Sequence, residues 1–294
     1  MSETTCTTEK PLFEVSKSIT ATLTPLYGAG EARAMTRIIF GHLKGWTPVD
    51  MAIRANEPVS AYMQGKIKEV VDRLLRYEPI QYIFGEADFY GLKLKVSPAT
   101  LVPRPETAEL VDLIVSENPG KDMRVLDLGT GTGCIALALS RNLPFSDVTA
   151  VDISDAALEV ARENASSLHA GVEFVKADIL TLPEHPGAIE GAPFDIIVSN
   201  PPYVADSEKK DMEPNVLRYE PAGALFVPDS DPLEFYRAIL RYGAGALAPG
   251  GKIYFEINPL FADQMKALCR KEGYADVSLT RDSFGKERFL RAMR

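Results

Sequence analysis

The stretch Arg-Val-Leu-Asp-Leu-Gly-Thr-Gly-Thr-Gly at residues 124–133 indicates a short buried strand that runs directly into a glycine-rich turn. Glycine permits such a tight turn and lets backbone N–H groups approach a ligand closely. Strand-like and helical segments alternate from here on, and strands are predicted at 124–128, 147–153, 172–177, 194–199 and 252–257. This alternation predicts an α/β fold with a doubly wound, mostly parallel, Rossmann-like sheet.

The 294-residue chain divides into three parts by pattern. Residues 1–78 carry helix formers and apolar residues at helical spacing, which predict a small helical domain. Residues 79–106 include an alternating Leu-Lys-Leu-Lys-Val segment, which predicts a β-hairpin linker. Residues 107–294 then form the α/β domain. Its last part, 275–294, indicates two strands, so we expect the sheet to end with an antiparallel strand.

Composition restricts the compartment and the partners. The net charge of −9 and the lack of any basic block disfavour a nucleic-acid partner, because a protein that binds a phosphate backbone usually presents a basic face. The sequence has no run of 18 apolar residues, so no membrane contact is expected. Its three cysteines lie far apart without a C-x-x-C pair, which indicates no metal site and fits a reducing compartment. We therefore expect a cytoplasmic protein.

The glycine-rich turn predicts a nucleoside site. Asp152 ends the second predicted strand, where a carboxylate can accept hydrogen bonds from ribose hydroxyls. The spacing G-x-G-x-G, rather than G-x-G-x-x-G, favours S-adenosylmethionine over NAD. A structural glycine turn with surface carboxylates is the alternative. Asp178, which ends the third strand, is expected beside the adenine with Ile179 against its face. The candidate cofactor-binding residues are Gly129, Thr130, Gly131, Thr132, Gly133, Asp152, Asp178 and Ile179.

A second motif, Asn-Pro-Pro-Tyr at residues 200–203, follows the fourth predicted strand. Its two prolines lack N–H donors, so the loop mainly offers acceptors, which suits a substrate NH2 group. The Asn200 side-chain oxygen and the Pro201 carbonyl would each accept one N–H bond, and Tyr203 would form a flat wall. Fixed acceptors would align the nitrogen with a methyl donor and stabilise the positive charge that grows on it. A carboxamide and an exocyclic base amine both meet these demands, and a rigid structural turn is the alternative. The candidate catalytic residues are Asn200, Pro201 and Tyr203, and the candidate substrate-binding residues add Pro202.

These motifs and several further segments resemble the HemK/PrmC family, the release factor glutamine methyltransferases. The resembling segments are the helical N-terminal part, 79–85, 89–91, 101–107 (Leu-Val-Pro-Arg-Pro-Glu-Thr), the glycine motif, 200–203, 219–221, and 281–285 with Arg288. The resemblance implies a methyltransferase sheet with one antiparallel strand. It also implies that Asn200 contacts the cofactor and that the N-terminal domain helps to hold the release factor.

For activity, the resemblance implies a protein-glutamine N-methyltransferase. A methyl group would pass from S-adenosylmethionine, with S-adenosylhomocysteine as product, to the side-chain amide nitrogen of a glutamine. That glutamine would belong to the Gly-Gly-Gln motif of class-I peptide chain release factors, so the reaction would tune translation termination.

Three alternatives stay open. A ribosomal-protein glutamine methyltransferase typically has Arg-Ser-Pro where this chain has Arg-Pro-Glu at 104–106. A DNA adenine or RNA guanine methyltransferase would share the Asn-Pro-Pro-Tyr motif but should add a basic recognition module. A protein that only binds S-adenosylmethionine would not need that loop. The chain departs from the family pattern at Ala108 (often Glu), Ile179 (often aromatic) and Asn258-Pro259 (often glycine), and we expect these departures to affect affinity more than activity.

Overall fold

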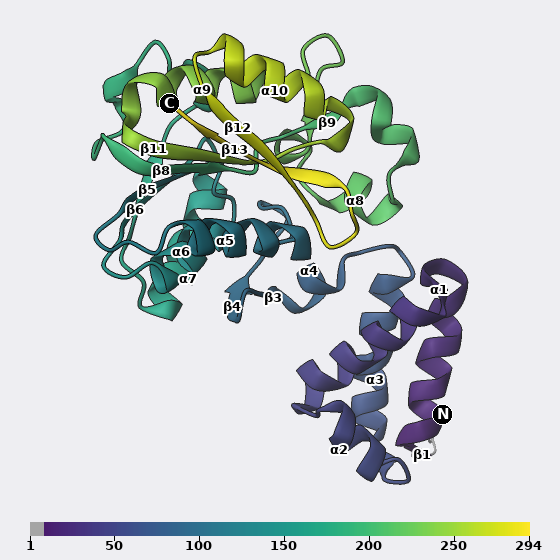
Figure 1. Ribbon diagram of the computed structural model, residues 1–294. Coiled ribbons are helices and arrows are strands. Elements are labelled where there is room, and N and C mark those ends of the chain that lie inside the picture. The colour runs from purple at the N-terminus through teal and green to yellow at the C-terminus, as the bar shows by residue number, and fades with distance from the viewer. Residues whose placement is uncertain (1–8) are drawn as a thin grey trace. The chain divides into compact units, whose positions relative to one another are not determined.

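The computed structural model describes residues 9–294, which fall into two units (Figure 1). Of the described residues, one unit comprises 9–84 and Pro214–Tyr219, and the other comprises Gly85–Glu213 and Glu220–Arg294. The hairpin thus belongs to the second unit, and one later helix belongs to the first. The domain limits at residues 78 and 106 stay a prediction.

The first unit is helical, as the sequence predicts. Its elements are β1 (Lys10–Pro11), α1 (Leu12–Lys44), α2 (Pro48–Ile53), β2 (Pro58–Val59), α3 (Ala61–Leu74), α4 (Ile80–Phe84) and α8 (Pro214–Tyr219). The Ser60 hydroxyl accepts a hydrogen bond from the Met63 N–H and so caps the start of α3. Apolar residues of α1, including Leu23 and Ile39, pack against Ile67 of α3 to form a core of this unit's own.

The second unit is built on a seven-stranded sheet in the order β12-β13-β11-β8-β5-β6-β7. Its strands are β5 (Arg124–Leu128), β6 (Asp147–Asp152), β7 (Val172–Lys176), β8 (Phe194–Ser199), β11 (Leu247–Glu256), β12 (Asp276–Arg281) and β13 (Glu287–Met293). The strands β11, β8, β5, β6 and β7 are parallel, whereas β13 is antiparallel to both β11 and β12. The predicted fold class, including the antiparallel terminal strand, is confirmed.

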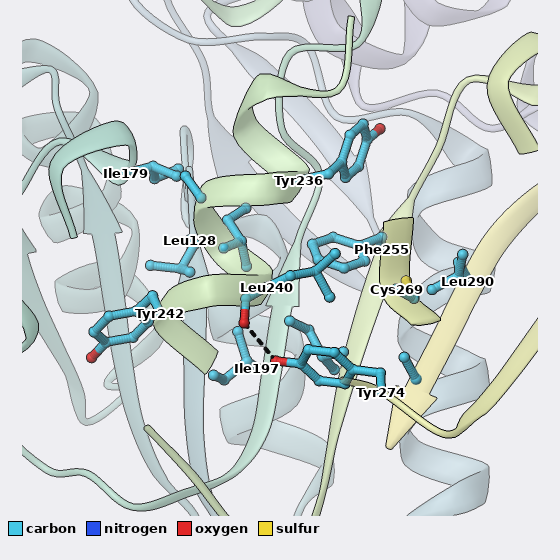
Figure 2. Packing of buried hydrophobic residues seen from close by; sticks show 14 of the residues in the cluster. Leu128, Ile179, Ile197, Tyr236, Leu240, Tyr242, Phe255, Cys269, Tyr274 and Leu290 are labelled. Atoms are coloured by element: carbon cyan, nitrogen blue, oxygen red, sulfur yellow. Dashed lines mark hydrogen bonds between the residues drawn. The ribbon is translucent and has the colours of Figure 1, made fainter. Parts of the chain in front are cut away.

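Helices cover both faces of this sheet (Figure 1). Successive strand residues point to opposite faces, so Val125 packs in one core and Leu126 in the other. The helices α5 (Pro105–Glu117), α6 (Cys134–Asn142) and α7 (Asp155–Leu168) lie on the first face, and α9 (Glu234–Ala246) and α10 (Ala262–Lys271) lie on the second. Figure 2 shows the second core, where the buried Tyr274 hydroxyl donates to the Leu240 carbonyl at 2.8 Å.

Shorter elements complete this unit. The predicted hairpin is formed by β3 (Glu86–Phe89) and β4 (Leu92–Lys95), which pair antiparallel. The remaining elements are β9 (Val204–Ala205), β10 (Phe226–Val227) and the 3-10 helices η1 (Ile179–Thr181), η2 (Pro186–Ala188), η3 (Asp206–Asp211), η4 (Ala222–Ala224) and η5 (Pro259–Phe261).

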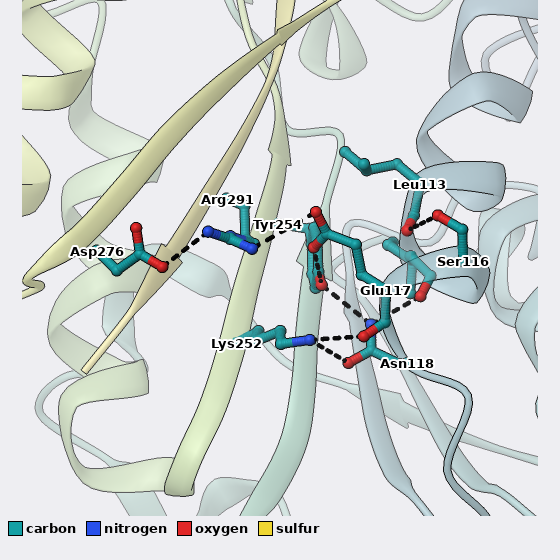
Figure 3. Close-up of polar contacts among 9 residues, drawn as sticks. Leu113, Ser116, Glu117, Asn118, Lys252, Tyr254, Asp276 and Arg291 are labelled. Atoms are coloured by element: carbon teal, nitrogen blue, oxygen red, sulfur yellow. Dashed lines mark hydrogen bonds and ion pairs between the residues drawn. The ribbon is translucent and has the colours of Figure 1, made fainter.

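Polar contacts fix the end of α5 to the sheet (Figure 3). The Lys252 ammonium donates to the Glu117 carbonyl at 2.7 Å, and the Tyr254 hydroxyl donates to the Glu117 carboxylate at 2.8 Å. Arg291 of β13 forms ion pairs with Glu117 and with Asp276. Because α5 is held against β11 in this way, its first turn has a defined position relative to the sheet.

Within residues 9–294, no helix is both long enough and apolar enough to cross a membrane.

Candidate active site

The two predicted motifs lie together at the carboxyl ends of the parallel strands β5 and β8. From β5 the chain continues outward through β6 and β7, and it then returns to the other side of β5 as β8. Such a reversal creates a switch point at the carboxyl ends of the strands, where open α/β sheets bind their ligands. Leu128 and Ser199, the last residues of β5 and β8, are register partners, and the Ser199 hydroxyl donates to the Leu128 carbonyl at 2.6 Å. The glycine turn and the Asn-Pro-Pro-Tyr loop therefore begin side by side.

The glycine turn has the backbone conformation that its sequence predicts. Gly129, Gly131 and Gly133 have φ angles of 78°, 54° and 80°, a region that residues with a side chain rarely adopt. The N–H groups of Gly129 and Thr130 both donate to the Val151 carbonyl at 2.9 Å, which anchors the turn to β6. A Cβ atom on Gly131 would meet no other atom within 4 Å, so the turn leaves room for a ligand.

Asp127 is a buried carboxylate directly before this turn. Its Oδ2 atom accepts from the Thr130 hydroxyl at 2.7 Å and from the Ala136 N–H at 3.2 Å. Its Oδ1 atom is buried and has no hydrogen-bond partner among the described residues. Burial raises the pKa of Asp127 from 3.8 to about 7, against the opposing effect of its hydrogen bonds. A polar atom that is buried and unpaired beside a ligand-binding turn suits a polar group on the ligand.

The raised pKa of Asp127 predicts how stability depends on pH. The folded protein holds this proton up to about pH 7, whereas the unfolded chain releases it near pH 3.8. Stability from this group is therefore complete below pH 3.8 and is lost as the pH rises through 7. The loss is on the order of 4 kcal/mol, at about 1.4 kcal/mol per pKa unit. We expect urea titrations to show that the unfolding free energy of the wild type falls relative to that of Asp127→Asn between about pH 4 and 7, and that the difference changes little above pH 7. Parallel curves for the two proteins would contradict the shift.

Asp152 lies beside the glycine turn. Its Oδ2 atom accepts from the Gly131 N–H and its Oδ1 atom accepts from the Ser154 N–H, both at 2.9 Å. Asp178 caps η1, because its Oδ1 atom accepts from the Leu180 N–H at 2.9 Å. Ile179 is 7% exposed and lies against the turn, with its Cδ1 atom 3.7 Å from where a Cβ on Gly129 would be. The structure thus brings Asp152 and Ile179 to the glycine turn, while Asp178 has a local capping contact.

The Asn-Pro-Pro-Tyr loop is anchored at its far end by β9 and β10. The N–H groups of Tyr203 and Val204 donate to the Leu225 carbonyl at 3.2 and 2.9 Å. Pro201 is buried and Asn200 is partly buried. Burial and the neighbouring Glu256 carboxylate raise the pKa of Tyr203, so its hydroxyl stays protonated and can donate.

Two residues that the sequence analysis did not single out lie under this loop. Glu256, the last residue of β11, is 1% exposed and accepts from the Thr107 hydroxyl at 2.7 Å and from the Tyr203 hydroxyl at 3.1 Å. The Asn200 Nδ2 atom in turn donates to the Thr107 hydroxyl oxygen at 3.3 Å. Burial raises the pKa of Glu256, and its two hydroxyl donors oppose that shift. One feature of the sequence could have identified Glu256 as a site residue. It is a charged residue at the carboxyl end of an apolar strand.

Two ion pairs stabilise the segments around this hydrogen-bond network of Asn200, Thr107, Glu256 and Tyr203. The Arg104 guanidinium pairs with the buried Glu220, which also accepts from the Val102 N–H at 3.3 Å. Arg288 donates to Asp282 at 2.8 Å, and that bond lowers the pKa of the Asp282 carboxyl. Leaving one partner of such a buried pair uncompensated is costly. Three segments that are far apart in the sequence therefore support the end of the sheet at which the parallel strands finish. They lie around residues 104, 220 and 282–288.

One departure from the family pattern, Asn258, and the neighbour of another, Glu109, have defined contacts. The Asn258 Nδ2 atom donates to the Tyr203 carbonyl at 3.2 Å and to Glu208 at 2.8 Å. Beside Ala108, the Glu109 carboxylate accepts from the N–H and the hydroxyl of Ser283 at 2.9 and 2.7 Å. The first contact joins Asn258 to the acceptor loop and to η3, and the second joins α5 to the loop between β12 and β13. Within residues 9–294, no three His, Cys, Asp or Glu residues are grouped so that they could hold a metal ion.

Comparison with known proteins matches both parts of the chain. Residues 119–274 match a methyltransferase domain model, and residues 14–85 match the PrmC N-terminal domain. A release factor glutamine methyltransferase of Bacteroides thetaiotaomicron is 46% identical over 95% of this chain and 99% of its own length. The enzyme of the same name from Streptococcus pneumoniae is 38% identical over 89% of this chain and 91% of its own length.

Solved structures agree on the fold. A methyltransferase from Pyrococcus furiosus has a TM-score of 0.50 and 21% identity, and the match covers 80% of this chain and 98% of that one. A 16S rRNA methyltransferase of T. thermophilus in complex with AdoMet and guanosine has a TM-score of 0.52 and 19% identity, over 71% of this chain and 49% of that one. At these identities the likeness shows the methyltransferase sheet and nothing finer.

Proposed function

Because the chain belongs to the release factor glutamine methyltransferase family, we propose that it methylates the side-chain amide nitrogen of a glutamine in class-I peptide chain release factors. The chain is an enzyme that uses S-adenosylmethionine. The glutamine in question is that of the Gly-Gly-Gln motif, whose methylation would tune translation termination. The observation that supports this most is the Asn-Pro-Pro-Tyr loop, held beside the glycine turn by buried contacts to Thr107 and Glu256.

The residues at the ends of β5 and β6 fit the cofactor. The open turn at residues 129–133 and the orphaned Oδ1 atom of Asp127 would accommodate a polar ligand. Asp152 still has lone pairs for ribose hydroxyls, since each of its oxygens accepts only one bond from the protein. Ile179, with Asp178, would flank the adenine, and Asn200 would complete the cofactor contacts. Ile179 offers a smaller face than an aromatic residue would, so adenine packing would be less extensive.

The acceptor loop meets the chemical demand of an amide nitrogen. A carboxamide nitrogen is a poor nucleophile because its lone pair is delocalised into the carbonyl group. The Asn200 side-chain oxygen and the Pro201 carbonyl would accept its two N–H bonds and fix its orientation, while Pro202 and Tyr203 shape the pocket wall. S-adenosylmethionine supplies a methyl group on a sulfonium, and transfer to the nitrogen leaves S-adenosylhomocysteine and releases one amide proton to solvent. These residues therefore act mainly by positioning and by stabilising positive charge on nitrogen.

We infer a protein rather than a nucleic acid as the substrate. The net charge is −9, which disfavours a phosphate backbone. The Arg-Pro-Glu sequence at residues 104–106 disfavours the ribosomal-protein alternative. Since release factors act on ribosomes, the proposed function also places this enzyme in the cytoplasm.

We also propose that the helical N-terminal domain, predicted at residues 1–78, helps to bind the release factor. Its match to the PrmC N-terminal domain supports this role. The glycine turn and the acceptor loop lie entirely in the other unit.

Mass spectrometry tests the proposed function directly. The purified enzyme is incubated with an intact class-I release factor and isotope-labelled S-adenosylmethionine, and the tryptic peptides are then sequenced. We expect one labelled methyl group on the glutamine side chain of the Gly-Gly-Gln peptide. A reaction without enzyme is the control. Label on another residue, or none on the release factor, would show that the proposed substrate is wrong.

A further inference from the structure

The amide group of Asn200 has two ends with opposite hydrogen-bonding character. Its oxygen accepts and its nitrogen donates, yet the two ends have nearly the same shape. The acceptor role requires the oxygen to face the substrate NH2 group, because the NH2 end would oppose it donor to donor. Something outside Asn200 must therefore select the orientation of its amide.

The selection begins at Glu256. This carboxylate is 1% exposed and sits at the end of β11, where its Oε2 atom accepts from Thr107 at 2.7 Å and its Oε1 atom from Tyr203 at 3.1 Å. A carboxylate only accepts, so the hydroxyl hydrogen of Thr107 must point toward Glu256. Burial raises the pKa of Glu256, whereas the two hydroxyl donors and the nearby Arg288 favour its charged form.

Thr107 passes this polarity on. With its only hydrogen committed to Glu256, the Thr107 oxygen offers nothing but lone pairs to its second neighbour. Asn200 accordingly donates its Nδ2 group to Thr107 at 3.3 Å, which leaves its Oδ1 atom for the pocket. An amide in the reverse orientation would bring two acceptors together.

We propose that Thr107 and Glu256 are positioning residues that hold the Asn200 amide with its oxygen toward the substrate nitrogen. This inference rests on the proposed function, because it assigns the acceptor role to Asn200. The same carboxylate also holds the Tyr203 hydroxyl, so one buried charge orients both sides of the acceptor loop. Thr107 is fixed in turn by its place in the first turn of α5, which the contacts of Glu117 secure against β11.

A set of Thr107 variants tests the link. Thr107→Val removes the hydroxyl at nearly constant volume, and Thr107→Ser retains it. Thr149→Val, at a buried position in β6, is the matched control for a threonine-to-valine change in this sheet. We expect Thr107→Val to slow single-turnover methylation of a release factor by about 10- to 100-fold, the scale for a displaced reacting group or a lost supporting contact. Thr107→Ser and Thr149→Val should react at nearly the wild-type rate, and calorimetry should show unchanged cofactor affinity for all three.

Two further readouts separate positioning from a general structural role. In an Asn200→Ala background, Thr107→Val should cause no additional loss, because the residue it acts through is already gone. In NMR spectra, Thr107→Val should shift the side-chain NH2 resonances of Asn200, assigned by their absence in Asn200→Ala, whereas Thr107→Ser should retain them.

Each outcome is decisive. A wild-type rate for Thr107→Val, or the same loss in both backgrounds, would overturn the positioning role while leaving the proposed function intact. An unshifted Asn200 resonance in Thr107→Val would overturn it as well. If the wild-type enzyme transfers no methyl group to release factors, the proposed function fails, and the NMR shift still decides whether Thr107 orients Asn200.

Discussion

Replacement of Asn200 by alanine is expected to slow the methyl-transfer step by about 100- to 1,000-fold, the scale for removing one preorganised contact to the transition state. The substitution deletes the side-chain acceptor and leaves only the Pro201 carbonyl to orient the substrate nitrogen. The loss should appear in the single-turnover rate at saturating substrate, because charge builds up on nitrogen only during transfer. Cofactor affinity, measured by calorimetry, should change far less.

A matched control distinguishes this effect from damage to the fold. Asn142→Ala changes an exposed asparagine at the end of α6, whose amide donates to the Ala138 carbonyl. That variant should transfer methyl groups at the wild-type rate. If Asn200→Ala also does so, the loop does not work through paired acceptors, and the catalytic assignment of Asn200 is wrong.

The sheet was predictable because its signals are local. A buried strand that leads into a glycine-rich turn can be recognised within ten residues, and β5 begins and ends as expected at Arg124 and Leu128. The first five residues of β11 were not predicted, because Leu247-Ala-Pro-Gly-Gly lacks strand character. Its register with β8 shifts between Leu247 and Lys252, so the sheet and not the local sequence extends the strand.

The support beneath the acceptor loop was not predictable, because it depends on residues distant in sequence. Thr107 and Glu256 are separated by 149 positions, yet their side chains share a hydrogen bond. Before the fold is known, Thr107 looks like any residue in the first turn of a helix. Glu256 looks like a solvated strand end. Their contact arises only when α5 packs beside β11, which propensity and periodicity do not describe.

The structural role of a departure from the family pattern was not predictable from the sequence either. From the sequence, Asn258 is a replacement for glycine with an expected effect on affinity. In the structure its amide donates to the Tyr203 carbonyl, so it supports the acceptor loop from the side of η5. Its Oδ1 atom accepts from the Leu260 N–H at 3.0 Å and caps that short helix. An asparagine at this place therefore has a structural reason that the family comparison alone does not supply.

We expect the largest differences in the rate of methyl transfer when four substrates are compared. They are an intact class-I release factor, its Gln→Asn variant, a free Gly-Gly-Gln peptide and duplex DNA. The asparagine variant carries the same amide on a shorter side chain, so its nitrogen would not reach the acceptors, and a misplacement of about 1 Å is enough for a 100-fold loss. The peptide should react slowly, because contacts to the rest of the factor supply the binding energy that positions the amide. Glycines beside the target matter for another reason, since they let its backbone enter a narrow pocket without side-chain collision. DNA should take up no label, because the acidic chain disfavours its backbone. Methyl transfer to DNA, or equal labelling of the asparagine variant, would overturn the assignment to glutamine.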